Sequence, residues 1–396
     1  MEMKVLEGVT VVDFTQAYSG PYSTMQLADF GARVIKIERR VYGDQSRAWM
    51  PLNERGKSGY FAVANRGKES IALDIRKPEA VEIIKKLVKR ADIVVENFKV
   101  GTLDKLGLGY EDLKAVNPEI IYASISGFGQ QGTWSKYAAY DNVIQSGCGM
   151  MELTGFADGA PTKVGPAIGD NFTGLTLALG IVMAYYHKLN TGKGQYLEVS
   201  MLDALFGMLE RPVLHKTLLQ EKYRRCGNGE PALAPYDAFL CKDGHFTVGF
   251  TRESSWKDFC RAIGQPELVD RKRFKTNMLR LEHKAELTEI IAAFCRDKTG
   301  KELEAIFDRY QIPSSFVNRV PELMKCPQLE EREMLVKIED EGVGTYLAMG
   351  NPVKMNRTPP VLKQGAPALG EATACVLEEL GYGNAEICSL YEAQVI

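Results

Sequence analysis

Apolar and polar positions in the first part of the chain predict strands separated by helices. Val9–Phe14 is rich in β-branched residues and predicts a buried strand, and Arg33–Glu38 alternates as a second strand would. Between them, Tyr22–Phe30 predicts a helix with Pro21 in its first turn. The same patterns predict strands at Ile71–Asp74, Ile93–Glu96 and Ile120–Ser124 and helices at Ala80–Arg90 and Tyr110–Val116. This order predicts a mostly parallel sheet covered on both faces.

The pattern changes near Lys216. Residues 224–235 are rich in glycine and proline and predict a linker or mobile loop. Tyr236–Leu240 and His245–Phe250 then predict an antiparallel hairpin. Helices are predicted at Ser255–Ile263, His283–Asp297 and Lys301–Arg309, and a strand- and turn-rich region after Leu329 ends in a helix at Glu371–Leu380. We therefore divide the chain into residues 1–215, a linker with a small α+β domain at 216–329, and a final part at 330–396.

One carboxylate stands out chemically. Asp170 precedes a run that is apolar almost all round, which predicts a buried helix with Asp170 at or near its N-terminus. Gly165 and Gly169 would let a bound molecule approach the backbone closely. Such a carboxylate can act as a nucleophile toward an activated acyl group. Taken locally, the residue is more readily a helix N-cap, because Asp is among the commonest capping residues.

Composition narrows the class of protein. The 396 residues are enough for two domains, and 45% hydrophobic with 25% charged residues is ordinary for a soluble globular enzyme. A formal net charge of −2 without a dense basic run argues against nucleic-acid binding. We expect no membrane-spanning stretch, no signal peptide and no membrane partner. Eight cysteines without a CxxC pair and four isolated histidines predict a cytoplasmic protein without a metal site. No GxGxxG follows the first strand, which argues against a dinucleotide site.

Spaced motifs along almost the whole chain resemble one family. They are LEGVTVVDF, GPYSTMQLADFGARVIKIER, NRGKESIALD, ADIVVENF, SGFGQQG, YDN, the GD at Gly169–Asp170, TGKGQ, RCGNGEP, KDGHFTVG, IPSSFV and GAPALGEATACVLEELGY. In this order, from Leu6 to about Tyr382, they resemble the class III coenzyme A transferases of the CaiB/BaiF type, which include formyl-CoA:oxalate CoA-transferase.

The resemblance implies a fold and an assembly. The fold class is α/β, with a large Rossmann-like domain built from both chain ends, so that residues 330–396 return to it, and a smaller α+β domain between. The family also implies an interlocked homodimer. These expectations come from the resemblance alone.

The resemblance also implies a mechanism. Asp170 matches the family nucleophile, which attacks an acyl-CoA thioester to give a mixed anhydride and then an aspartyl-CoA thioester. A free carboxylic acid then takes over the acyl activation. CoA enters as part of the acyl-CoA substrate, and no tightly bound cofactor is implied.

Four further positions match CoA-binding residues of the family. These positions are Arg39, Lys68, Asn97 and Lys105. Arg39 would lie near the adenosine phosphates, and Lys68 would neutralise phosphate as a point charge. Arg39 can instead be a solvated charge at a strand end, and Asn97 can simply cap a turn.

Tyr140 and Asp141 separate two activities within the superfamily. The related α-methylacyl-CoA racemases place a catalytic histidine where this chain has Tyr140. Proton transfer at a substrate carbon needs a group that titrates near neutrality, and tyrosine does not. A racemase is therefore the second hypothesis, and a non-catalytic CoA-binding protein is the third.

The chain departs from the oxalate-type pattern around the expected substrate pocket. Tyr18 replaces a glutamine and Ala138 replaces a lysine, so oxalate would lose its cationic partner. The small-domain loop that covers the acceptor in the family is here the shorter CGNGEPALAP, with Gly227, Asn228 and Gly229. We expect a larger or less charged carboxylate than oxalate.

Overall fold

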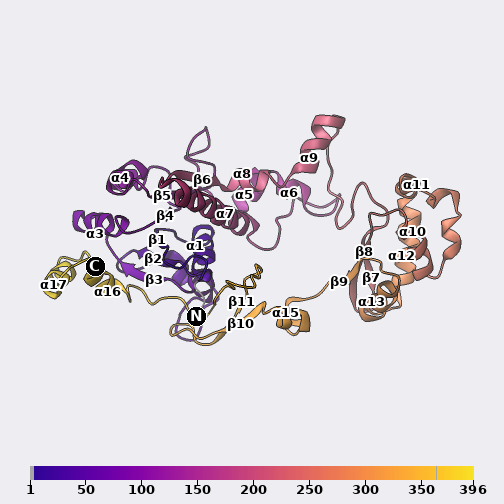
Figure 1. The fold of residues 1–396 in the computed structure, drawn as a ribbon. Helices are drawn as coiled ribbons and strands as arrows, with labels where there is room; N and C mark the ends of the chain where they lie inside the picture. The colour runs from indigo at the N-terminus through magenta and orange to yellow at the C-terminus, as the bar shows by residue number, and fades with distance from the viewer. Residues whose placement is uncertain (1–3, 363) are drawn as a thin grey trace. The chain divides into compact units, whose positions relative to one another are not determined.

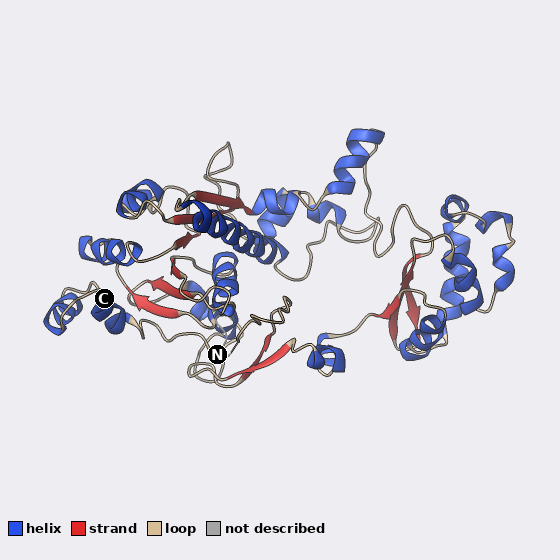
Figure 2. Cartoon of the chain, in the orientation of Figure 1, coloured by secondary structure: helices blue, strands red, loops and turns tan. Residues whose placement is uncertain are grey.

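The computed structural model describes residues 4–362 and 364–396. They form two compact units (Figures 1 and 2). The first contains the described residues up to Met150 together with residues 163–217 and 328–396. The second contains residues 151–162 and 218–327.

A six-stranded parallel sheet organises the first unit. Its strands are β1 (Thr10–Asp13), β2 (Arg33–Glu38), β3 (Glu69–Ala72), β4 (Ile93–Glu96), β5 (Ile121–Ser126) and β6 (Tyr196–Ser200). The order is β3-β2-β1-β4-β5-β6, and every neighbouring pair is parallel. The predicted parallel α/β sheet is confirmed. Because β2 and β4 lie on opposite sides of β1, the loops after β1 and β4 diverge, which makes a ligand-binding crevice at their carboxyl ends.

Helices connect the strands and pack on one another. Their bounds are α1 Ser19–Asp29, α2 Gly59–Asn65, α3 Pro78–Val88, α4 Tyr110–Val116, α5 Asp141–Gly147, α6 Met150–Leu153, α7 Ile168–Thr191, α8 Met201–Phe206 and α9 Glu210–Leu214. Helix α3 shows why they form: Pro78 begins it with a φ suited to a first turn, and Ile83, Ile84 and Leu87 bury one face. Helix α7 packs against α1, β5 and β6.

The C-terminal part of the chain belongs to the same hydrophobic core. It forms the β10 (Leu335–Ile338) and β11 (Tyr346–Met349) hairpin and the helices α15 (Pro327–Glu331), α16 (Thr373–Glu379) and α17 (Asn384–Glu392). Val376 and Ile396 are buried in one cluster with Val12 and Ile35 of the central strands. The Asp74 N–H donates to the Val395 carbonyl at 2.8 Å, which ties this segment to the chain after β3.

The second unit is a small α+β assembly. It contains β7 (Tyr236–Cys241), β8 (Gly244–Gly249), β9 (Ser314–Phe316), α10 (Ser255–Ala262), α11 (Asn277–Glu282), α12 (Lys284–Arg296), α13 (Gly300–Arg309) and α14 (Val320–Leu323). The predicted hairpin is present as the antiparallel pair β7 and β8, and β9 extends it. Phe246, Phe259 and Phe307 form the centre of a separate core.

Helix α7 corrects two expectations. It is not buried on every side: apolar side chains along one face are 44–70% exposed. They are Leu175, Leu179, Val182, Met183, Tyr186 and Leu189. The helix is also long and apolar enough, by length and composition, to cross a membrane, contrary to our expectation. The buried face of α7 is apolar because it contacts the sheet and α1. The opposite face is apolar as well, so the composition of the whole helix resembles that of a membrane-spanning helix.

Several elements have no counterpart in the sequence analysis. Strand β6 was not predicted, because its outward positions include the polar Glu198 and only its last residue, Ser200, is buried. Helix α2 is seven residues long, too short for a clear helical period, and α17 buries none of its residues fully. The secondary structure of such segments depends on the elements they contact, and their own pattern of apolar and polar residues does not predict it.

Gly174 allows the close contact between α1 and α7. A Cβ at this position would lie 2.5 Å from the Ser19 carbonyl oxygen and 3.0 Å from the Tyr22 ring. We expect Gly174→Ala to lower the free energy of unfolding by about 1–3 kcal/mol, because the clash involves backbone. Gly180→Ala on the same helix is the control: its Cβ meets only the flexible end of Leu197. There the gain in helix propensity, about 1 kcal/mol, offsets the contact. Chemical denaturation of both variants checks this; equal losses would contradict it.

Candidate active site

A cavity of about 340 Å³ lies at the carboxyl ends of β1, β4 and β5. The loop after β1 contributes Gln16 and Ala17, and the loop after β4 contributes Asn97 to Val100. The segment before α5 contributes Ala138 and Tyr140. Asp170, in the first turn of α7, lines the same cavity. The crevice expected from the strand order therefore contains the carboxylate that the sequence singled out.

Asp141 caps the helix that carries Asp170. Ala167, at the N-cap position of α7, has no side-chain acceptor. Instead, the Asp141 carboxylate accepts the Gly169 N–H at 2.7 Å and lies 3.4 Å from the Asp170 N–H. A Cβ on Gly169 would lie only 2.9 Å from the Asp141 oxygen, so glycine permits this approach. Asp170 is the third residue of α7, so it is not the N-cap of this helix. Asp141, from α5, caps the helix instead.

Gln145 holds Asp141 in place. Its side chain is fully buried, its Nε2 donates to the Asp141 carboxylate at 2.7 Å, and its Oε1 accepts the Val164 N–H at 2.8 Å. One amide thus connects α5 to the chain that leads into α7. Sequence analysis missed Gln145, because a glutamine within a short helix carries no signal of burial.

The environment of Asp170 favours its neutral form. Burial is the main cause, and the nearby Asp141 charge adds to it, so that the pKa of Asp170 rises to about 7. A hydrogen bond from the Ser19 hydroxyl, at the start of α1, acts in the opposite direction. A carboxylate with a raised pKa is more basic, and therefore a stronger nucleophile once ionised. Ser19 was not predicted, since a serine before a helix is normally a capping residue.

Arg39 connects this cavity to a second one. The second cavity, of about 670 Å³, shares Gln16, Arg39 and Phe98 with the first. The Arg39 side chain is exposed and has no ion-pair partner among the described residues. Further cations line the second cavity, among apolar side chains such as Phe14 and Leu73. They are Arg40, Arg76 and Lys77, none of which the sequence analysis assigned.

The remaining predicted residues lie elsewhere. Lys105 is an exposed residue in a short 3-10 helix between Thr102 and Leu106 of the second cavity. The Lys68 ammonium is buried, and it pairs with Asp13 at 3.0 Å and donates to the Pro21 carbonyl and Asn65. All three of its N–H donors are thus used inside the protein.

Tyr18 lines a further cavity, of about 490 Å³, together with Tyr60. Their rings are 4.9 Å apart. Burial raises the pKa of Tyr18 to about 12, with a contribution from the Asp170 charge, which places Tyr18 in the field of that carboxylate.

The predicted loop glycines belong to the second unit. The Gly227 N–H donates to the Gly155 carbonyl at 3.0 Å, and the Gly229 N–H donates to the Cys226 carbonyl at 3.1 Å. Gly227 has a φ of +62°, which favours glycine. Asn228 lies between them in the same turn.

Residues 6–373 match CoA-transferase family III. The chain belongs to this family. It is 37% identical over 391 residues to succinyl-CoA:mesaconate CoA-transferase of Haloarcula hispanica, covering 96% of this chain and 98% of that protein. It is 35% identical over 396 residues to human succinyl-CoA:glutarate CoA-transferase, covering 100% and 90%. A solved CaiB/BaiF family protein from Brucella suis aligns with a TM-score of 0.85 at 34% identity, covering 96% of this chain and all of that one.

Membership in CoA-transferase family III confirms the resemblance and the class of reaction: CoA moves between an acyl-CoA and a carboxylate. Among the described residues, no group of three or more His, Cys, Asp or Glu side chains is placed to hold a metal ion. The side chain of Tyr140, where a racemase would have histidine, is 63% exposed at the edge of the cavity.

The pH dependence of kcat/KM tests the environment of Asp170. If Asp170 is the nucleophile, activity requires its ionised carboxylate, so kcat/KM should rise with pH and reach half of its plateau near pH 7. Asp141→Asn removes the like charge but keeps an oxygen for the Gly169 N–H. The pKa of Asp170 should fall, and the acidic limb should move to lower pH. Glu111→Gln, an exposed charge on α4, is the control.

The two effects of Asp141→Asn are separable. A lower plateau of kcat/KM would report loss of the hydrogen bond between residue 141 and Gln145. The pH at which the acidic limb of the profile lies would report the loss of the Asp141 charge. A limb that stays in place or moves to higher pH in Asp141→Asn would contradict the assigned cause.

Proposed function

We propose that this CoA-transferase moves CoA from a dicarboxylic acyl-CoA to a free carboxylic acid, with Asp170 as the nucleophile. The observation that carries the proposal is the partly buried, ionisable Asp170 carboxylate, which lines a cavity with Ser19 in the first turn of a helix capped by Asp141. The activity corresponds to EC class 2.8.3.

The reaction proceeds through covalent intermediates on Asp170. A carboxylate oxygen attacks the thioester carbonyl, the C–S bond breaks, and a mixed anhydride and CoA thiolate form. The thiolate attacks the aspartyl carbonyl, releasing the donor acid and giving an aspartyl-CoA thioester. The acceptor carboxylate then attacks that carbonyl, displacing the thiolate and forming a second anhydride. Thiolate attack on the new acyl carbon regenerates Asp170 and releases the product.

The cavities supply a binding path for acyl-CoA. The second cavity, with Arg39 and Arg40, suits the phosphates of CoA, and its apolar walls suit the adenine ring. Arg76 and Lys77 line it too, but Arg76 pairs with Asp74 and Lys77 donates to the Ala393 carbonyl. Because Arg39 lines both cavities, the pantetheine arm can pass beside it to Asp170. Lys105 borders this path, and Asn97 supports it by holding the Gln16 backbone. Lys68 has no place in this path, since its donors are occupied.

The acid substrates follow from the relatives and from the pocket. Two of the relatives are named for succinyl-CoA with the five-carbon acids mesaconate or glutarate, and another for acetyl-CoA with oxalate. The cavity has two cations, Arg39 and Lys99, that can face a distant carboxylate of such an acid. Tyr18 and Tyr60 offer an apolar wall for its carbon chain. We therefore propose succinyl-CoA as donor and a dicarboxylate longer than oxalate as acceptor.

Transfer assays test this function directly. Wild type and Asp170→Asn are incubated with succinyl-CoA and glutarate, mesaconate or oxalate, and products are resolved by mass spectrometry. We expect glutaryl- or mesaconyl-CoA from wild type, and a loss of at least about 10³-fold in Asp170→Asn, because an amide is not a nucleophile. CoA binding should persist in the variant. Transfer by Asp170→Asn at the wild-type rate would overturn the role of Asp170.

Two simple measurements separate the alternatives. Hydroxylamine should trap an acyl group from acyl-CoA on wild type but not on Asp170→Asn, whereas a non-catalytic binder traps none. Deuterium incorporation at the substrate α-carbon in deuterated water would instead indicate a racemase.

We also propose a homodimer formed with a second copy of this chain. The exposed apolar face of α7, defined above by its six side chains, is larger than isolated surface residues explain. Leu179→Glu on this face should weaken the dimer, measured as molar mass by light scattering after gel filtration. Asn190→Glu, on a polar position of α7, is the control. A monomeric wild type, or an unchanged dimer in Leu179→Glu, would contradict this interface.

The cysteines support a cytoplasmic location. All eight are free in the described chain, four of them buried. Buried thiols without disulfides fit a reducing compartment.

A further inference from the structure

The loop from Thr15 to Tyr18 has an unusual backbone conformation. It leads from β1 into α1, and Gln16 and Ala17 line the active-site cavity. Ala17 has a φ of +66°, in the left-handed region that residues with a side chain rarely adopt. Such a conformation persists only where the surrounding structure imposes it.

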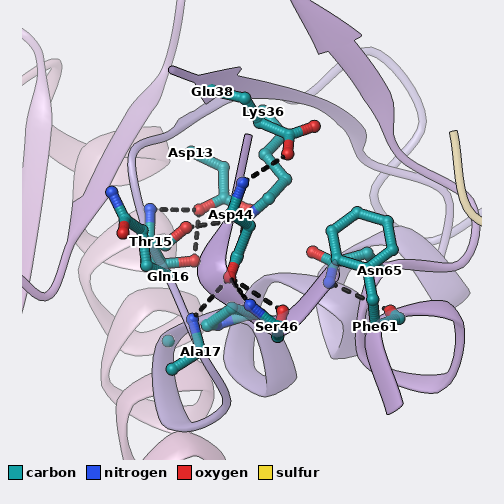
Figure 3. A network of polar contacts seen from close by, with 12 residues as sticks. Asp13, Thr15, Gln16, Ala17, Lys36, Glu38, Asp44, Ser46, Phe61 and Asn65 are labelled. Carbon is teal, nitrogen blue, oxygen red and sulfur yellow. Dashed lines mark hydrogen bonds and ion pairs between the residues drawn. The ribbon is translucent and has the colours of Figure 1, made fainter. Parts of the chain in front are cut away.

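A buried ion pair holds this loop at two points. The Lys36 Nζ donates to the Thr15 carbonyl at 2.6 Å and pairs with an Asp44 oxygen at 2.9 Å. The other Asp44 oxygen accepts the Ala17 N–H at 3.1 Å. Figure 3 shows Lys36 and Asp44 beside the loop, with the Asp44 carboxylate directed toward Ala17. One ion pair therefore fixes the residues before and after Gln16.

Asn97 holds Gln16 itself. Its Oδ1 accepts the Gln16 N–H and its Nδ2 donates to the Gln16 carbonyl, both at 2.8 Å. Three consecutive residues of the loop are thus bound through their backbone by three side chains from different parts of the chain. These bonds from Lys36, Asp44 and Asn97 fix the geometry of the loop backbone, and the buried Thr15 hydroxyl separately donates to Asp13.

Stability alone is a poor explanation for the ion pair. The side chains of Lys36 and Asp44 are both fully buried. Taking two charges out of water costs several kcal/mol per ion, and apolar residues of similar size are often at least as stabilising. Glu38 and Asp13 lie close to the same ammonium and hold further parts of the network. What the pair provides specifically is the position of the loop backbone.

The loop in turn positions a contact of the nucleophile. Ser19, directly after the loop, lines the same cavity as Asp170, and its hydroxyl acts to lower the pKa of that carboxyl. The approach is tight: a Cβ on Gly20 would lie 2.5 Å from the Thr15 side chain and 3.2 Å from Asn97. A change in the Ala17 backbone would therefore move Ser19 relative to Asp170.

We propose that Lys36 and Asp44 are positioning residues for CoA transfer, which hold the Thr15–Tyr18 loop in its left-handed turn and thereby place Ser19 against Asp170. The proposal rests on the proposed function only in its kinetic part. The clamp itself is a property of the folded chain.

Hydrogen exchange measures the clamp without any substrate. Lys36→Met keeps the length of the side chain and removes its charge. The double variant Lys36→Met with Asp44→Asn also removes the unpaired buried carboxylate, so folding is preserved while the Ala17 N–H keeps an acceptor. We expect faster amide exchange in the peptide covering residues 14–20 in both variants. Unchanged exchange in that peptide would overturn the clamp.

Kinetics measure its role in transfer. If the loop positions Ser19, kcat should fall roughly 10- to 100-fold in the double variant while KM for succinyl-CoA changes little. Faster exchange with an unchanged kcat would overturn the positioning role. If wild type itself transfers no CoA, the proposed function fails, and the exchange data still decide the clamp.

Ala17→Gly distinguishes positioning from general stability. Glycine adopts positive φ without the penalty that alanine carries, which favours the active turn by roughly 5- to 30-fold when nothing else holds it. Added to the double variant, Ala17→Gly should raise kcat several-fold. In the otherwise wild-type protein, Ala17→Gly should change kcat little. No recovery would indicate that Lys36 acts only through packing.

Arg66→Met is the matched control. Arg66 is another buried cation, bonded to both carboxylate oxygens of Asp29, and neither residue contacts the loop backbone. It should lower the thermal midpoint without faster exchange at residues 14–20 and without a selective loss of kcat. A loss of kcat equal to that of the double variant would assign both effects to stability.

Discussion

The removal of one carboxylate from water is the constraint on which the site depends. In the mechanism we propose, Asp170 has to be shielded enough to protect an anhydride from hydrolysis, yet ionised to attack a thioester. Burial and the Asp141 charge both oppose ionisation, and the Ser19 hydroxyl favours it. No lysine or arginine of the described chain is among the groups that shift its pKa. The balance is therefore set by hydrogen bonds and by the capping carboxylate, rather than by a salt bridge.

Other buried carboxylates, at the carboxyl ends of β1 and β2 and in the loop after β2, are held in the opposite way. Asp13, Asp44 and Glu38 are also buried, but each lies beside Lys36, Lys68 or Arg47, and their pKa values are lowered. Paired charges of this kind stay ionised and hold backbone in place. One fold thus keeps some carboxylates permanently charged for structure, and leaves another without a cation for chemistry.

The sequence predicts the framework better than the site. Strands such as Arg33–Glu38 and Ile93–Glu96 carry strong β-branched patterns, and they are found at the predicted bounds. Asp170 could be singled out because it precedes a long apolar run, and motif order pointed to the family. Ser19, Gln145 and Lys36 could not, because their roles arise from contacts between segments distant in sequence. The exposed face of α7 was missed for a related reason: an apolar sequence does not say what covers it.

The missing cation at Asp170 has a consequence for the energy profile of the reaction. In the mechanism we propose, acylation converts the Asp170 anion into a neutral anhydride and moves the negative charge to the CoA thiolate, which ends the repulsion between Asp170 and Asp141. The proposed covalent intermediate is therefore free of a repulsion that raises the free energy of the ionised resting enzyme. A lysine beside Asp170 would stabilise the resting anion and deepen that well, slowing attack on the thioester. The cavity is thus matched to the acylated enzyme more closely than to the free one.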